Sequence, residues 1–278
     1  MVPLRLVLQA YGREDIKEQA LYAVWTALAW SDGVPLEVHV YTDDAGWLAP
    51  LGDRVKARLL APDEIRAWRG PADFVHRLKA EMIRDVVRRF PDGKLLYVDG
   101  DVAFRASPAA VFERIGPARA VLHLREYDIA THPTKQLRRF RRRMRSVTFR
   151  GKSVELGEAM WNAGAVGLDA SHYPLVDEWL ALVDEVYAQW PYWIHEQWAI
   201  SKLLLGAGTV SPADDAIFHY WAQKDDAVAA IRPELTLLRS RPFEEALAHV
   251  RERPLRLPPP VHRHSTLRER IARIFRKL

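Results

Sequence analysis

The chain has 278 residues, of which 49% are hydrophobic, so it can bury a substantial core as one large α/β domain or two small ones. Its formal charge of +5, from 41 basic and 36 acidic residues, is a mild excess that suits a phosphate-bearing ligand or an anionic surface. It contains no cysteine, which excludes disulfides, thiolate zinc sites and cysteine nucleophiles. A catalytic metal would therefore need oxygen or imidazole ligands.

The sequence shows neither a signal-peptide pattern nor an apolar run of bilayer length. Residues 1–10 enter a short apolar run without a basic flank or a small-residue cleavage site. No run approaches the roughly 20 apolar residues that cross a bilayer. We therefore expect a cytoplasmic protein, and its short ends favour a bacterial one.

The first hundred residues alternate between patterns typical of strands and of helices. Continuous apolar runs at 4–9, 36–41 and 95–98 predict buried strands, and apolar side chains at helical spacing predict helices over 14–30 and 76–90. This alternation predicts an α/β fold in which a parallel sheet has helices on both faces. Ligands of such folds bind beyond the carboxyl ends of the strands, so the residues that follow each strand are the first candidates for a site.

The second half of the chain has a less regular pattern. We expect strands at 120–124 and 163–168, and helices at 173–190 and 194–204. Strands that precede clustered helices suggest an extension of the first half rather than a continuation of its alternation.

Two carboxylates separated by a glycine follow the apolar strand at 95–98. Apolar residues resume directly after Asp99, Gly100 and Asp101, so burial of both charges requires a compensating partner. Mn²⁺ or Mg²⁺ is a suitable partner, because these cations prefer carboxylate oxygens and leave positions for phosphate oxygens and water. The missing side chain at Gly100 would let a ligand approach the backbone. A plain turn is the alternative, since Asp-Gly is a common turn dipeptide.

An apolar strand that ends in Asp-Xaa-Asp resembles the signature of the family 8 glycosyltransferases, the glycogenin and lipopolysaccharide galactosyltransferase type. The segment 161–169 resembles the strand of that family that lines the donor sugar, with Ala163 in place of the usual serine. His195-Glu196-Gln197 resembles the Asp-Gln pair near the transferred sugar, with a glutamate in place of the aspartate.

Further motifs follow the order that this family has. A Phe-His-Tyr-Trp segment resembles the late motif whose histidine, His219 here, completes the metal shell. Lys224 resembles the lysine that binds the diphosphate, at a spacing one residue shorter. Arg77 and Lys79, on the helix before the acidic pair, match basic residues that contact the donor. The resemblance spans roughly residues 4–224, and the order and spacing of the motifs make it specific.

The resemblance implies a GT-A fold, in which a Rossmann-like, mixed and mostly parallel sheet is flanked by helices. It places a glycosyltransferase domain over residues 1–253, with a nucleotide-binding half at about 1–105 and an acceptor-side half at about 106–253. The implied activity is metal-dependent transfer of a hexose from a nucleotide-diphospho-sugar, usually a UDP-sugar, to a glycan or lipid-linked acceptor, with retention. An inverting enzyme is the alternative, with Glu196 as its base.

The site residues implied by the resemblance fall into three groups. The cation would bind Asp99, Asp101 and His219, because imidazole is a ligand that Mn²⁺ tolerates. The residues next to the transferred sugar would be Asn162, Glu196 and Gln197. The remaining donor contacts would be Ala10, Tyr11, Gly12, Arg77, Lys79, Gly100, Gly164 and Lys224. The first three of these are placed only by topology, at the end of the first strand.

Each of these residues also has a plainer interpretation. His219 could be a histidine packed among aromatic residues, and Lys79 and Lys224 could be solvated cations. Glu196 is favoured near a helix start by the helix dipole alone. Gly164 could mark a strand that contacts another backbone closely.

Two basic segments lie outside these motifs. Residues 135–145 carry seven basic side chains around three apolar ones at helical spacing. This pattern is typical of a solvated face or partner surface, or of an element that meets an anionic acceptor or lipid headgroups. Residues 254–264 read as a proline-rich spacer, and 265–278 predict a basic amphipathic helix. That helix could lie on the inner face of an anionic membrane, on the protein's own core or on a second copy.

Three other functions fit parts of the sequence. A nucleotidyltransferase also uses acidic metal ligands on an α/β sheet, but no glycine-rich phosphate loop follows the first strand. A nucleic-acid-binding protein could use the basic segments, but it leaves the acidic pair and Asn162 unexplained. A non-catalytic homologue that binds sugar nucleotides fits the altered positions Ala163 and Glu196. We therefore expect a nucleotide sugar as ligand and no nucleic acid.

Overall fold

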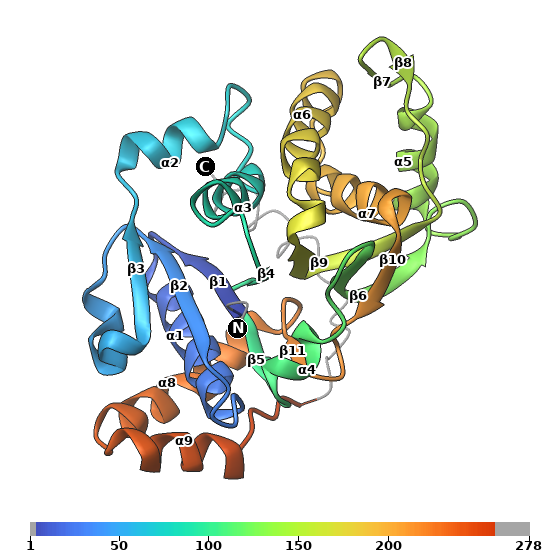
Figure 1. Cartoon of the computed structure of the whole chain (residues 1–278). Helices are drawn as coiled ribbons and strands as arrows, with labels where there is room; N and C mark the ends of the chain where they lie inside the picture. Colours follow the sequence, from blue (N-terminus) through green and yellow to red (C-terminus); the bar gives the residue numbers. More distant parts are fainter. Residues whose placement is uncertain (1–3, 259–278) are drawn as a thin grey trace, which may run out of the picture.

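The computed structural model describes residues 4–258. The amphipathic helix predicted over 265–278 and most of the predicted spacer lie outside these residues. The described chain forms a mixed seven-stranded sheet with helices on both faces (Figure 1). The strands of this sheet are β1 (Leu4–Ala10), β2 (Leu36–Thr42), β3 (Val55–Leu59), β4 (Lys94–Val98), β6 (Arg119–Asp128), β9 (Ala159–Asp169) and β10 (Thr209–Pro212).

Shorter elements surround the sheet. Two small ladders pair β5 (Val102–Phe104) with β11 (Ile217–His219) and β7 (Thr148–Phe149) with β8 (Lys152–Ser153). The α-helices are α1 (Glu14–Ala29), α2 (Pro62–Trp68), α3 (Arg77–Arg89), α4 (Pro108–Phe112), α5 (Lys135–Met144), α6 (Pro174–Gln189), α7 (His195–Ala207), α8 (Lys224–Arg239) and α9 (Phe243–Glu252). Two 3₁₀ helices are η1 (Gly46–Arg54) and η2 (Ala170–His172).

The strand order is β10-β6-β9-β4-β1-β2-β3. β9 runs antiparallel to both of its neighbours, β4 and β6, whereas the other paired strands of the sheet are parallel. The predicted mixed, mostly parallel sheet is therefore confirmed. The regular alternation of the first hundred residues continues only to β4.

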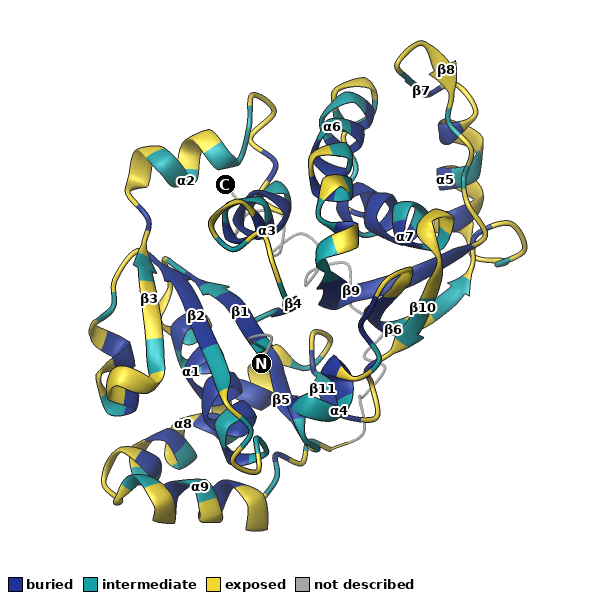
Figure 2. Cartoon of the chain, viewed as in Figure 1, coloured by how far each residue is buried: buried dark blue, intermediate teal, exposed yellow. Residues whose placement is uncertain are grey.

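Two hydrophobic clusters cover the two faces of the sheet. Because successive side chains of a strand point to opposite faces, Leu6 and Leu8 pack towards α1, α8 and α9, while Val7 packs towards α3, α6 and α7. The central strands are buried along most of their length (Figure 2), which explains why they appear in the sequence as unbroken apolar runs. The prediction of helices on both faces is confirmed.

Several elements were not predicted from the sequence: β3, α2, β5, α4, the β7–β8 hairpin, β10, β11, α8 and α9. β3 is an edge strand with exposed side chains, so it lacks the apolar run of a buried strand. Over residues 4–258, no helix is both long and apolar enough to cross a membrane.

Candidate active site

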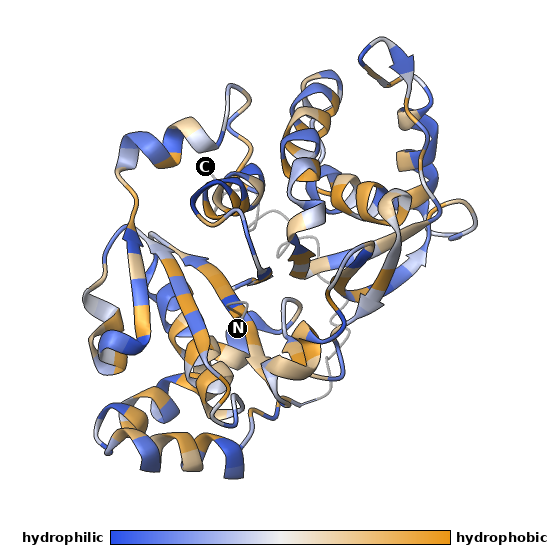
Figure 3. Cartoon of the chain, viewed as in Figure 1, coloured by the Kyte–Doolittle hydropathy of each residue, from blue (hydrophilic) through white to orange (hydrophobic). Residues whose placement is uncertain are grey.

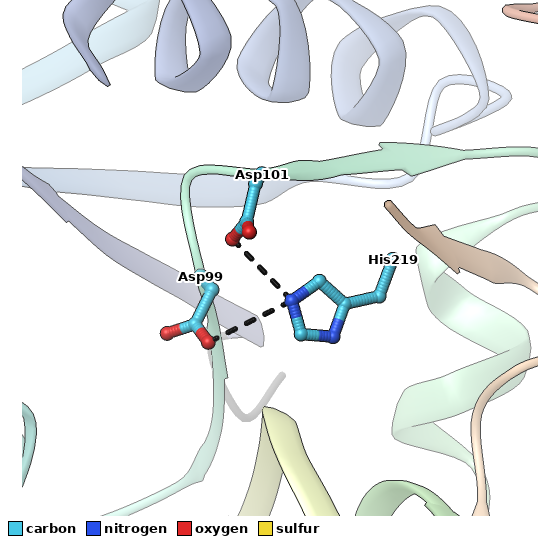
Figure 4. A group of neighbouring side chains, drawn as sticks. All are labelled: Asp99, Asp101 and His219. Carbon is cyan, nitrogen blue, oxygen red and sulfur yellow. Dashed lines mark ion pairs between the residues drawn. The ribbon is translucent and has the colours of Figure 1, made fainter. Parts of the chain in front are cut away.

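Two carboxylates and a histidine meet beyond the end of β4. Asp99 and Asp101 follow β4 directly, and antiparallel pairing of β5 with β11 sets His219 opposite Val102. His219 Nε2 lies 3.4 Å from Asp101 Oδ1 and 3.9 Å from Asp99 Oδ2 (Figure 4). One ligand atom from each of the three side chains falls within 4.8 Å of the others. This is the arrangement that a divalent cation with oxygen and imidazole ligands requires.

A hydrogen bond from the neighbouring strand fixes the histidine ring. Asn162 Nδ2 donates to Glu126 Oε1 at 3.0 Å, so the amide oxygen of Asn162 faces His219. This oxygen only accepts, and therefore His219 Nδ1 donates to it at 2.9 Å. A neutral ring then has its lone pair on Nε2, which is the atom that faces Asp99 and Asp101. The donor set therefore fits a metal ion.

Gly164 makes room for this histidine. A Cβ atom at Gly164 would lie 2.2 Å from His219 Nδ1 and 2.9 Å from the Asn162 side-chain oxygen. The Gly164 carbonyl also joins β9 to the end of β4, because it accepts from the Asp99 N–H at 2.9 Å. The Gly164 N–H donates to the Asn162 side-chain oxygen on the same strand, at 2.9 Å. A larger residue at this position would displace the ring.

Two lysines balance the acidic pair. Lys224 Nζ forms an ion pair with Asp101, 2.8 Å from its Oδ2. Without a cation, burial would raise the pKa of Asp101, but the hydrogen bond and charge of His219 with a proton on Nε2, and then the charge of Lys224, hold this pKa below its ordinary value. Lys79 is buried and lies 3.2 Å from Asp99, which also accepts from Tyr97 Oη at 2.6 Å.

Lys79 joins the acidic pair to a third carboxylate. Burial would lower the pKa of Lys79, but the charges of Asp99 and Glu196 raise it, so the ammonium stays protonated. Lys79 Nζ lies 3.4 Å from Glu196 Oε1 and donates to the Ala163 carbonyl at 2.9 Å. Burial raises the pKa of Glu196 to about 7, and the charge of Lys79 opposes that rise.

A network of amides around one carboxylate adjoins the acidic pair and is joined to it by the hydrogen bond between His219 and Asn162. Glu126, near the end of β6, accepts from the Asn162 amide at 3.0 Å and from Gln197 Nε2 at 2.9 Å. These three residues come from β6, β9 and α7. Glu126 was not among the predicted site residues, because nothing local in the sequence distinguishes one glutamate near a strand end; only the register of β6 against β9 brings it here.

A cavity of about 470 Å³ opens over these groups. Trp193 and Trp221 line it while remaining 53% and 57% exposed, and the half-exposed side chains of Ile16 and Val75 line it as well. The predicted site residues that line it are Tyr11, Lys79, Asp99, Gly100, Asp101, Asn162, Gly164, Glu196, Gln197, His219 and Lys224. The lining residues that the sequence analysis did not single out for the site include Gln9, Gln19, Tyr97, Glu126 and Trp193.

Three predicted donor contacts lie outside the lining of this cavity. Ala10 is fully buried at the end of β1. Gly12 donates its N–H to Asp43 Oδ2 at 2.8 Å, in a turn with φ of +78°. Arg77 is directed towards α6, where Nε lies 2.6 Å from Asp184 Oδ1. A helix residue two positions from Lys79 points to a different side, which the sequence motif does not reveal.

No family model matches the sequence, and no curated protein sequence matches it. Solved structures do match it by shape. The galactosyltransferase LgtC, in complex with donor and acceptor sugar analogs, has a TM-score of 0.53 at 14% identity, over 76% of this chain and 74% of that chain. The bifunctional glycosyltransferase WbbM has a TM-score of 0.52 at 12% identity, over 76% of this chain and 39% of that chain.

An active-site mutant of LgtC gives a similar result, with a TM-score of 0.52 at 16% identity over 76% of this chain and 73% of that chain. This chain has the GT-A fold. In its GT-A sheet, the acidic pair follows β4 at the centre, and β9, which carries Asn162 and Gly164, is the antiparallel strand beside it. The predicted fold is thus confirmed from the similarity of structure, although the identities are low.

Proposed function

We propose that this protein is a metal-dependent glycosyltransferase that moves a sugar from a nucleotide-diphospho-sugar, with UDP as its nucleotide, to a glycan or lipid-linked acceptor. The observation that carries the proposal is the cluster of Asp99, Asp101 and His219, which lines the cavity of a GT-A fold. Two carboxylates and an imidazole lone pair that converge on one point form a ligand set suited to a divalent cation.

The proposed cation is Mn²⁺ or Mg²⁺, held by Asp99, Asp101 and His219. When bound, it would neutralise the charge that develops on the leaving nucleotide diphosphate. Lys79 is buried and fixed between two carboxylates, so it would keep the floor of the site in place. Lys224 is 55% exposed and would exchange Asp101 for a donor phosphate, as a point charge on a flexible stem.

The sugar would lie against the cavity residues Asn162, Glu196 and Gln197. The amides of Asn162 and Gln197 are held in position by Glu126, which is the support that a sugar-binding group needs. Retention of configuration is part of the proposal. Proton NMR of the product anomer tests it, since an inverted product would instead make Glu196 the candidate base.

Thermal unfolding with nucleotides tests the donor site. The protein is heated with UDP, GDP or ADP, each with and without Mn²⁺, and compared with Asp101→Asn and with Asp53→Asn, a control at an exposed position of η1. Ligand at a hundred times its dissociation constant adds about 2.7 kcal/mol of stability. We expect a rise in Tm that requires UDP and Mn²⁺ together, persists in Asp53→Asn and disappears in Asp101→Asn.

Absence of any metal-dependent response to a nucleotide would contradict the proposal. A response without hydrolysis of any donor sugar or transfer to any acceptor would favour the non-catalytic binding protein instead.

A further inference from the structure

Helix α5 presents a face made almost entirely of cations. Its buried side chains, Leu137, Phe140 and Met144, lie on one side and pack into the core. The opposite side is exposed, and its cations are Lys135, Arg138, Arg139, Arg142, Arg143 and, at the end of the helix, Arg145. Figure 3 shows this mixture of hydrophilic and hydrophobic residues along α5. We call these six exposed side chains the α5 cationic face.

The described chain supplies no countercharge to the α5 cationic face. Over residues 4–258, none of its six side chains has a carboxylate within ion-pair distance, although ion pairs are numerous on the other helices. Arg138 donates only to the Pro133 carbonyl, at 2.7 Å. Like charges three or four residues apart on a helix repel each other, so this face lowers the stability of α5 in the free protein.

No other part of the molecule suits this face. The C-terminal residues 265–278 are themselves basic, with four arginines and one lysine against one glutamate. A second copy of the chain carries a net formal charge of +5, so long-range attraction between copies does not favour this contact. The α5 cationic face is therefore better suited to an external anion.

The shape of the face selects an extended partner. Ten helical residues span about 15 Å, and the six cations spread over the convex outer side of the helix. A single phosphate cannot contact all of them, because they diverge rather than converge. The face also lacks an aromatic side chain on which a base could stack, which disfavours single-stranded nucleic acid. We propose that the α5 cationic face binds the surface of an anionic phospholipid bilayer.

The position of α5 connects this surface to the cavity. Arg141 donates to the carbonyls of Ile129 and His132, which tie α5 to the loop that leaves β6. The Phe140 ring lies 6.2 Å from the Tyr192 ring, next to Trp193 in the cavity wall. α5 therefore packs, through Phe140 and Tyr192, against the segment that contributes Trp193 to the cavity.

Vesicle binding tests this interaction without donor or acceptor, so the result does not depend on the proposed transfer reaction. The full chain is floated with vesicles of phosphatidylcholine alone or mixed with phosphatidylglycerol. The test variant combines Arg138→Gln, Arg139→Gln, Arg142→Gln and Arg143→Gln. The matched control removes the same charge from exposed positions at and after α8 and α9: Arg239→Gln, Arg241→Gln, Arg253→Gln and Arg256→Gln.

We expect the unaltered chain and the control to bind only the anionic vesicles, and to lose them as salt is raised. Each cation near such a surface contributes about fivefold to the binding constant, so the binding constant of the test variant for anionic vesicles should fall on the order of several hundredfold. Arginine-to-lysine changes at the same four positions should retain binding, which separates loss of charge from loss of fold.

Three results would overturn the proposal. An equal loss of vesicle binding in the test variant and in the control would mean that binding depends only on net charge and not on α5. Unchanged binding in the test variant would assign the membrane contact to another segment, such as residues 265–278. Tighter binding to a single-stranded RNA than to anionic vesicles at the same salt would replace the bilayer with nucleic acid.

Discussion

The two walls of the cavity are built in different ways. The acidic wall, Asp99, Asp101 and His219, comes from one strand end and from the short β5–β11 ladder, and it acts through charge. The amide wall, Glu126, Asn162 and Gln197, comes from three separate elements and acts through the direction of its hydrogen bonds. A charged cluster tolerates small shifts of position better than a hydrogen-bonded network does, because Coulomb attraction falls slowly with distance.

The walls meet at one hydrogen bond, from His219 Nδ1 to Asn162. The tautomer of His219 that the proposed cation needs is therefore set by the amide wall. Changes at this junction should weaken both the proposed cation binding and the proposed sugar binding. Changes further from the junction should affect one of the two and leave the other intact.

Substitution of Gly164 by alanine should have the largest effect. The new Cβ would collide with His219 and turn its ring away from the carboxylates. Loss of one of the three proposed metal ligands should lower the proposed rate of sugar transfer on the order of a thousandfold and abolish the expected Mn²⁺-dependent rise in Tm. Steady-state kinetics with a UDP-sugar measures the first effect.

Gly206→Ala on α7 is the matched control, because a Cβ atom there would meet nothing within 4 Å. Its activity should be unchanged. Full activity of Gly164→Ala would mean that His219 is not a ligand.

Substitution of Glu196 by glutamine should alter the pH dependence of stability. Its folded pKa of about 7 lies above the ordinary value because of burial, so between pH 4.5 and 7 the folded state holds a proton that the unfolded state releases. The free energy of unfolding should therefore fall as pH rises through this window, by about 3 kcal/mol relative to Glu196→Gln.

Denaturant unfolding at pH 4.5 and pH 8, with EDTA present, measures this difference. Glu155→Gln, at an exposed position, is the control and should behave as the parent does. A difference between Glu196→Gln and the parent that does not change with pH would show that Glu196 is ionised throughout.

Substitution of Arg77 by glutamine should affect stability and leave the site alone. Arg77 pairs with Asp184 and with the buried Glu81, so its loss should lower the free energy of unfolding by about 2 kcal/mol. This is less than the loss expected when a buried charge is left with no partner, because Arg84 still contacts Glu81. Arg88→Gln, which breaks a more exposed contact from α3 to Asp177, should cost under about 1 kcal/mol. A weaker response to UDP in Arg77→Gln, at unchanged stability, would instead make Arg77 a donor contact.

Substitution of Glu126 by glutamine should have the smallest of these effects. The two amides donate to different oxygens of Glu126, and glutamine has only one side-chain oxygen, so one amide loses its acceptor. The value of kcat/KM should then fall about tenfold. The response to UDP and Mn²⁺ should remain, because the acidic wall is intact. Glu158→Gln, an exposed control just before β9, should match the parent in both assays.

The acidic wall could be predicted from the sequence, and the amide wall only in part. Asp99 and Asp101 directly follow an unbroken apolar run that predicts a buried strand, and the resemblance of the Phe-His-Tyr-Trp segment to a motif of the family 8 glycosyltransferases suggested His219. Glu126 gave no such signal. Arg77 and Lys79 look equivalent as neighbours in a motif, yet one side chain joins α6 and the other lines the cavity.

The sequence by itself determined the central buried strands, the helices α1, α3, α6 and α7, and the cationic pattern of α5, because periodicity and unbroken apolar runs are local properties. Only the tertiary structure decided that β9 runs antiparallel beside β4, that Gly164 makes room for His219, and that Glu126 aligns two amides. Those facts depend on register and contact between segments distant in the chain, and no local pattern of residues encodes them.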